Sequence, residues 1–326
     1  MPHRLGSLVF GFVPARTGKR GDRVELSQKR MRKQLERMKP LITGCSMELA
    51  RKGQDALGAL LSRSYHKEVR VEEVCFPGFP ACRIVPRDQS PVGRMLYLHG
   101  GGYVCGDLEY AKGFGSVLSA VTGAEVLCPA YRLAPEHPFP AGLEDSFSAY
   151  QFLLEQEGPV VLCGESAGGG MIYALCFLAK EEGLPLPAGL IGISPWTDLT
   201  ASGGSYEENR ERDPSMTRER LDLFASCYTE CRDNPLVSPL FGDLTGFPPS
   251  LLFVGGDEIM LDDSRRLHEN LLSCGCSSTL EISPELWHAY VLYCLKERRT
   301  DLDRIAAFCH SCFCGENNFQ IPRKKA

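Results

Sequence analysis

The chain has 326 residues, of which 43% are hydrophobic and 24% are charged, and its formal net charge is −5. This composition is typical of a folded globular protein, with room for one large α/β domain or two small ones. The acidic balance argues against general nucleic-acid binding, and no apolar run reaches the length of a membrane span.

The chain contains 15 cysteines, and several of them lie inside apolar patterns, where cysteine packs as a small hydrophobe. The apolar run at 8–13 is short for a signal peptide, and no small-residue cleavage site follows it. We therefore expect a cytoplasmic protein with reduced thiols. The cysteines at 309–314 lack a second ligand pair at zinc-site spacing, so we expect no metal site.

Residues 1–60 are polar and largely helical in pattern, with ten Lys or Arg against three Asp or Glu between Arg16 and Lys39. Such a basic run is usually a solvated helix face. From residue 95 onward, short apolar runs typical of strands alternate with amphipathic helical patterns. The strand-like runs are 95–98, 124–128, 160–163, 190–193, 251–254 and 279–282, and the helical segments between them include 142–157 and 171–182.

This alternation predicts an α/β fold with a mainly parallel sheet covered by helices on both faces. A ligand site is then expected beyond the carboxyl ends of the strands. The segment 200–232 departs from the alternation, because a Ser- and Gly-rich, charged start is followed by a helical pattern over 216–227. Inserted helices of this type commonly pack above such a sheet as a lid.

The first of two glycine motifs is His99–Tyr103, which reads HGGGY and follows the strand-like run 95–98. Three consecutive glycines leave backbone N–H groups accessible, as an oxyanion hole requires. The sequence matches neither a Walker loop nor a dinucleotide-binding loop. We predict that Gly100 and Gly101 donate to an oxyanion here.

The second motif is Gly164–Gly169, which reads GESAGG and follows the run 160–163. A serine with glycines two residues away on both sides, between a strand and a helix, is the nucleophile-elbow pattern. We predict that Ser166 is the nucleophile. The N–H of Ala167, the residue after it, is expected to complete the oxyanion hole.

A serine hydroxyl needs a base to take its proton, and in hydrolases with this elbow the acid and then the histidine follow the serine. Three histidines follow the predicted nucleophile, and only His288 lies in a loop after a strand-like run. For the acid we choose Asp257, which comes directly after the run 251–254 and two glycines. Asp262 and Asp263 remain alternatives, although they can instead cap the next helix.

With these residues placed, the chain resembles the hormone-sensitive-lipase-like esterases, the bacterial family IV or HGGG group of α/β-hydrolases, from about Leu96 to Tyr290. The match includes the two glycine motifs, the acid and the histidine, and further the segments Tyr131–Ala141 (YRLAPEHPFPA), Ser194–Asp198 (SPWTD) and Ser238–Leu240 (SPL). The resemblance implies an α/β-hydrolase fold, and a metal-independent serine carboxylesterase that acts on short- to medium-chain esters without a cofactor.

The resemblance also implies how the chain is divided. A single domain would cover 1–326, with a cap formed by about 1–60 and about 200–232 and a catalytic core of about 70–199 and 233–315.

Other motif residues have supporting or binding roles by this resemblance. His99, Gly102 and Glu165 are expected to support the site, and Glu165 stands where the family often has Asp. The aromatic residues Tyr103 and Trp287 are candidates for the wall of the substrate pocket.

Two alternatives stay open. The same triad can hydrolyse an amide, a formamide or a lactone, because acyl transfer from these leaving groups uses the same catalytic groups. The other alternative is a ligand-binding receptor on an inactive hydrolase fold, like the plant gibberellin receptors, which lack the histidine that His288 supplies here. We expect a small-molecule ester as partner, neither nucleic acid nor stable membrane insertion, and edge strands that offer a route to a homodimer.

Overall fold

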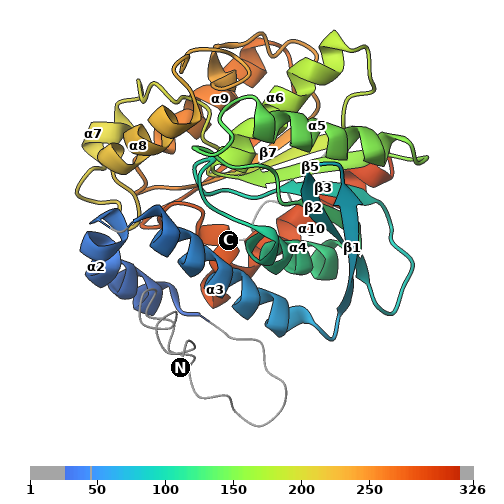
Figure 1. Cartoon of the computed structure of the whole chain (residues 1–326), viewed down its shortest axis with the longest axis horizontal. Helices are drawn as coiled ribbons and strands as arrows, with labels where there is room; N and C mark the ends of the chain where they lie inside the picture. The colour runs from blue at the N-terminus through green and yellow to red at the C-terminus, as the bar shows by residue number, and fades with distance from the viewer. Residues whose placement is uncertain (1–25, 45, 316–326) are drawn as a thin grey trace, which may run out of the picture.

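The structure is a computed structural model that describes residues 26–44 and 46–315, so the apolar run at 8–13 and the basic residues before 26 lie outside the described part. A twisted sheet crosses the molecule, with helices on both of its faces (Figure 1). Its eight strands lie in the order β1-β2-β4-β3-β5-β6-β7-β8. The strands are β1 (Val69–Phe76), β2 (Phe79–Pro86), β3 (Arg94–Leu98), β4 (Glu125–Pro129), β5 (Val160–Glu165), β6 (Gly189–Ile193), β7 (Ser250–Gly255) and β8 (Ser278–Ser283).

The pairing from β4 to β8 is parallel, as the strand–helix alternation predicts. The apolar pattern of the sequence does not predict β1 and β2, which form an antiparallel hairpin, with β2 also antiparallel to β4. Strand β1 lies at the edge of the sheet and carries charged, exposed residues at several positions. Its composition therefore lacks the continuous apolar run that marks the buried parallel strands.

The helices divide between the two faces of the sheet. Apolar residues of α5, α6 and α9 pack into one core, and those of α4 and α10 pack into the other. The helices are α2 (Gln28–Gly44), α3 (Met47–Tyr65), α4 (Leu108–Thr122), α5 (Ala141–Leu154), α6 (Ala167–Glu181), α7 (Ser205–Glu208), α8 (Arg218–Tyr228), α9 (Leu261–Ser273) and α10 (Arg299–Phe313), with short 3-10 turns at Pro239–Phe241, Tyr290–Tyr293 and Lys296–Arg298.

Local sequence explains where α4 begins and ends. The side chain of Asp107 accepts hydrogen bonds from the N–H groups of Glu109 and Tyr110 at 2.8 and 3.0 Å, a capping interaction worth about 1 kcal/mol. The helix ends at Thr122 and is capped by Gly123, whose φ of +73° is left-handed. This helix carries Tyr110, which reaches the functional site described below.

The helices α2, α3 and α8 lie at one end of the molecule, where Figure 1 shows the blue and yellow segments approaching one another. Residues from all three line one cavity together with the loops that follow β3 and β5. These loops begin at the carboxyl ends of neighbouring parallel strands, which is where the fold predicts a ligand site. Within residues 26–44 and 46–315, we find no helix with the length and hydropathy to cross a membrane.

Candidate active site

Ser166 lies on the tight turn between β5 and α6, in a conformation that non-glycine residues rarely adopt. Its φ is +54° and its ψ is −121°, and its N–H donates to the carbonyl of Ile193 at 2.9 Å. A Cβ at Gly164 would lie 2.3 Å from the carbonyl oxygen of Gly168, and a Cβ at Gly168 would lie 2.1 Å from that of Leu98. Both flanking positions therefore require glycine, which is the physical basis of the elbow pattern.

His288 lies in the loop after β8, and the carboxylate that holds it is that of Glu258. The distance between His288 Nδ1 and Glu258 Oε2 is 2.7 Å. The other oxygen, Oε1, accepts from the hydroxyl of Ser194 at 2.9 Å and from the N–H of Gly255 at 2.8 Å. Glu258 is fully buried, so its charge is balanced by these three contacts rather than by water.

The protonation of the pair follows from burial and from mutual contact. Burial lowers the pKa of His288, but the hydrogen bond and the charge of Glu258, together with the charges of Asp213 and Glu165, outweigh it, and the imidazole pKa is raised above 6.5. Burial raises the pKa of Glu258, and the hydrogen bond from His288 opposes that effect. A carboxylate on Nδ1 fixes the imidazole tautomer, so that Nδ1 carries the proton and Nε2 is free to accept one.

The prediction that Asp257 orients His288 is therefore wrong. Asp257 Oδ2 accepts from Arg32 at 2.7 Å, and Oδ1 accepts from Arg212. The two adjacent carboxylates diverge after β7, with Glu258 directed to the interior and Asp257 directed to the covering helices. The only signal for Glu258 in the sequence is that it directly follows Asp257. The spacing does not show which of the two carboxylates contacts the histidine.

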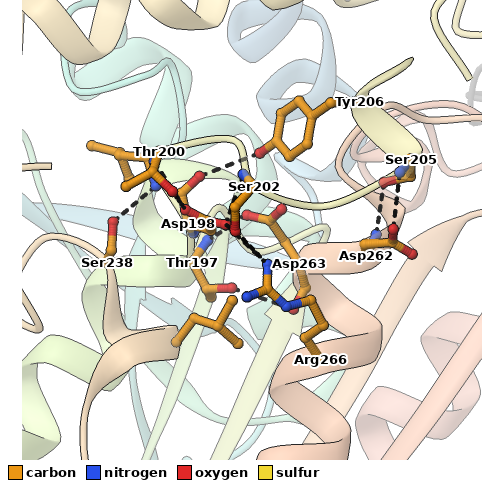
Figure 2. Close-up of polar contacts among 12 residues, drawn as sticks. Thr197, Asp198, Thr200, Ser202, Ser205, Tyr206, Ser238, Asp262, Asp263 and Arg266 are labelled. Atoms are coloured by element: carbon orange, nitrogen blue, oxygen red, sulfur yellow. Dashed lines mark hydrogen bonds and ion pairs between the residues drawn. The ribbon is translucent and has the colours of Figure 1, made fainter. Parts of the chain in front are cut away.

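The alternatives Asp262 and Asp263 also form hydrogen bonds with other groups, as Figure 2 shows. Asp262 accepts from the N–H of Ser205 at 2.9 Å, and Asp263 accepts from the N–H groups of Thr197 and Asp198 at 3.0 and 2.9 Å. The network ties the start of α9 to the segment that follows β6. It fixes the start of the 200–232 insertion. Glu258, and not Asp262 or Asp263, is the carboxylate bonded to His288.

The glycine loop is tied to β5 by Glu165. Its Oε1 accepts from the N–H of Gly100 at 2.6 Å and from the hydroxyl of Tyr110 at 2.9 Å, and its Oε2 accepts from Tyr97 at 2.6 Å. Burial raises the pKa of Glu165 to about 7, although these three donors oppose it. Glu165 is thus a fully enclosed carboxyl group that fixes the distance between β5 and the loop.

This contact corrects the expected set of oxyanion donors. The N–H of Gly100 is used by Glu165 and is not available to an oxyanion. In the part of the chain that the structure describes, no acceptor bonds the N–H groups of Gly101, Gly102 or Ala167. Gly101 and Gly102 line the same cavity as Ser166.

His99 stabilises the same loop by hydrogen bonding and by ring stacking. Its Nδ1 lies 2.7 Å from the carbonyl oxygen of Gly100, and its ring stacks on Tyr131 with centroids 4.2 Å apart. The hydroxyl of Tyr131 donates to the carbonyl of His99 at 2.6 Å. Burial lowers the pKa of His99 to about 4, so the ring is neutral at pH 7 and acts through packing and hydrogen bonding.

The cavity measures about 180 Å³ and is bounded on one side by Ser166 and His288. Its other walls come from the covering helices, with apolar side chains such as Leu35 of α2, Leu57 of α3 and Phe224 of α8. Most of its surface is therefore hydrocarbon, with Ser166 and His288 at one end. Such a site suits the apolar part of a small molecule.

Neither aromatic residue proposed for the pocket wall lines this cavity. Tyr103 is buried and stacks on Tyr228 with centroids 3.8 Å apart. Trp287 is fully buried and packs edge-on against Tyr293 at 5.6 Å. Both side chains are core residues, because they contact aromatic neighbours rather than open space.

Comparison with known proteins agrees with this geometry. A family model described as the alpha/beta hydrolase fold matches residues 95–292. An acetyl-hydrolase of Streptomyces hygroscopicus is 40% identical over 221 residues, which are 66% of this chain and 74% of that protein. An esterase of Acinetobacter venetianus is 32% identical over 243 residues, which are 68% of this chain and 80% of that protein.

Solved structures of esterases have the same fold as this chain. A crystal structure of EstE5 soaked with p-nitrophenyl butyrate has a TM-score of 0.82 and 34% identity, over 88% of this chain and 98% of that one. An esterase from the bacterial hormone-sensitive lipase family has a TM-score of 0.79 and 32% identity, over 88% and 98% of the two chains.

The chain therefore belongs to the α/β-hydrolase family. Within it, the chain is a hormone-sensitive-lipase-like esterase, and its activity is hydrolysis of carboxylic esters. The predicted fold and the family resemblance are both confirmed.

Proposed function

We propose that ester hydrolysis in this protein runs through Ser166, His288 and Glu258. The observation that carries the proposal is the 2.7 Å contact between His288 and the buried Glu258, on the wall of the cavity that Ser166 also lines. Ser166 attacks the ester carbonyl while Nε2 of His288 takes its proton. The imidazolium then passes the proton to the leaving alcohol, and a water molecule hydrolyses the acyl-enzyme by the same route.

We further propose that the N–H groups of Gly101, Gly102 and Ala167 bind the oxyanion. They are fixed before the substrate arrives, so they cost no reorganisation when charge develops on the carbonyl oxygen. Loss of one such donor typically costs about 100- to 1,000-fold in rate. Glu165 supports this arrangement, because it holds Gly100 at 2.6 Å and so fixes the start of the loop.

For the substrate we propose short- to medium-chain esters covered by a cap of α2, α3 and α8. A cavity of about 180 Å³ with an apolar lining favours a small acyl or alcohol group over a long chain. The covering helices carry the apolar walls, whereas the core carries the reactive groups. Chain-length preference is then a property of the cap.

The test is covalent labelling of the folded protein with a fluorophosphonate, followed by mass spectrometry of the peptides. The expected result is one adduct on Ser166 that is lost in Ser166→Ala and in unfolded protein. A folded protein that fails to react at Ser166 contradicts the mechanism. A series of p-nitrophenyl esters, beside one anilide and one lactone, then identifies the preferred bond and chain length.

A further inference from the structure

Asp257 is held between two guanidinium groups from the segments that cover the cavity. Its Oδ2 accepts from Arg32 of α2 at 2.7 Å, and its Oδ1 accepts from Arg212, which lies between α7 and α8. Only 4% of the Asp257 surface is exposed. Because a buried carboxylate without a partner is costly, Asp257 constrains the position of both arginines.

Arg32 joins three separate segments to its own helix. Besides Asp257, it donates to the carbonyl of Glu285 at 2.7 Å and to the carbonyl of Arg212 at 3.1 Å. Asp257 and Glu285 lie in the loops that carry the proposed acid and the proposed base, respectively. Arg212 lies in the 200–232 insertion. A guanidinium has the planar fork of donors needed to bridge three acceptors, which a lysine ammonium lacks.

The helix that carries Arg32 also forms a wall of the cavity. Met31, Leu35 and Met38 of α2 all line it. A shift of α2 would therefore change the cavity walls without moving the nucleophile. The side chain of Asp257 is paired with the two arginines. Its effect on the site therefore depends on the position of α2, which carries one of them.

We propose that Arg32, Asp257 and Arg212 form a latch that holds α2 over the cavity. Asp257 is then a positioning residue that sets the affinity for esters long enough to contact α2. This inference rests on the proposed function of the site. The latch acts on substrate binding, whereas Glu258 acts on the chemical step.

The test compares Asp257→Asn and Arg32→Ala with the wild-type full chain on p-nitrophenyl acetate and p-nitrophenyl hexanoate. We expect KM for the hexanoate to rise about tenfold in both variants, and KM for the acetate to rise less than about twofold. Arg32→Lys should give an intermediate KM, because it keeps the charge and loses the bridging geometry. Lys33→Ala, an exposed neighbour on the same helix, is the matched control and should leave both KM values unchanged.

Three results would overturn the latch. One is an equal rise of KM for both esters, and another is a loss of kcat in Asp257→Asn as large as in Glu258→Gln. The third comes from hydrogen exchange of the backbone amides of 28–44 without substrate, where unchanged protection in Asp257→Asn rejects the latch. Faster exchange in that variant, but not in Lys33→Ala, supports it. If the wild type hydrolyses neither ester, the proposed function fails, and hydrogen exchange still decides the latch.

Discussion

Replacement of Glu258 by glutamine is the sharpest test of the proposed mechanism, because the contacts of the two carboxylate oxygens differ. Oε1 accepts from the N–H of Gly255 and from the hydroxyl of Ser194. The backbone N–H can only donate, so this position requires an acceptor. The amide oxygen of the introduced glutamine must stay at that position to satisfy the N–H. The amide NH₂ then faces Nδ1 of His288, where the carboxylate now lies at 2.7 Å.

An NH₂ group at this position forces Nδ1 to accept, so the imidazole proton moves to Nε2. That tautomer cannot take the proton of Ser166. The known cost of a wrong tautomer in a serine protease triad is about 10⁴-fold in kcat, and we expect about 10³- to 10⁴-fold here, or roughly 4 to 5.5 kcal/mol of transition-state stabilisation. The fold should survive, because the substitution removes a buried charge and keeps the side-chain volume.

The assay is steady-state hydrolysis of p-nitrophenyl acetate, with thermal unfolding as a check on the fold. Glu269→Gln, an exposed glutamate on α9, is the control and should retain wild-type kcat. A folded Glu258→Gln with kcat within about tenfold of the wild type would refute the reasoning, since the tautomer argument requires a loss of several kcal/mol. It would also remove Glu258 from the mechanism.

Three further predictions concern pH and packing. Because the pKa of His288 is raised and the base must be neutral, kcat/KM should rise with pH along a limb centred above 6.5, and a flat profile from about pH 5 to 9 contradicts His288 as base. Folded Glu165 keeps its proton up to about pH 7, against an ordinary pKa of 4.5, so its contribution to stability is complete below 4.5 and is lost as pH rises through 7. The free energy of unfolding should then fall by about 3 kcal/mol across that window, and urea titrations should show this slope removed in Glu165→Gln. Gly168→Ala would place a Cβ 2.1 Å from the carbonyl oxygen of Leu98 and should lower stability by about 1–3 kcal/mol or more, measured by thermal unfolding beside Gly44→Ala, where the space is open.

The sequence by itself was enough to predict the parallel strands β3 to β8 and the positions of Ser166 and His288, but not the antiparallel strands β1 and β2. Apolar runs of strand length and glycines at their carboxyl ends indicated β3 and β5, and the glycine spacing around Ser166 reflects contacts too close for any Cβ. The position of His288 in a loop after a strand-like run predicts that it lies near Ser166, and it lines the same cavity as Ser166. These features are local, because each depends on a strand, a turn and the residue that follows it.

The tertiary structure decided what each polar group bonds to. Asp257 and Glu258 are adjacent in the chain, and only the three-dimensional path after β7 sends one to the arginines and the other to His288. In the sequence the N–H of Gly100 is equivalent to that of Gly101, and only the fold brings the carboxyl group of Glu165 to the first of them. Hydrogen-bond partners far apart in sequence cannot be derived from spacing, because the direction of a side chain in a loop depends on backbone dihedral angles that tertiary packing sets.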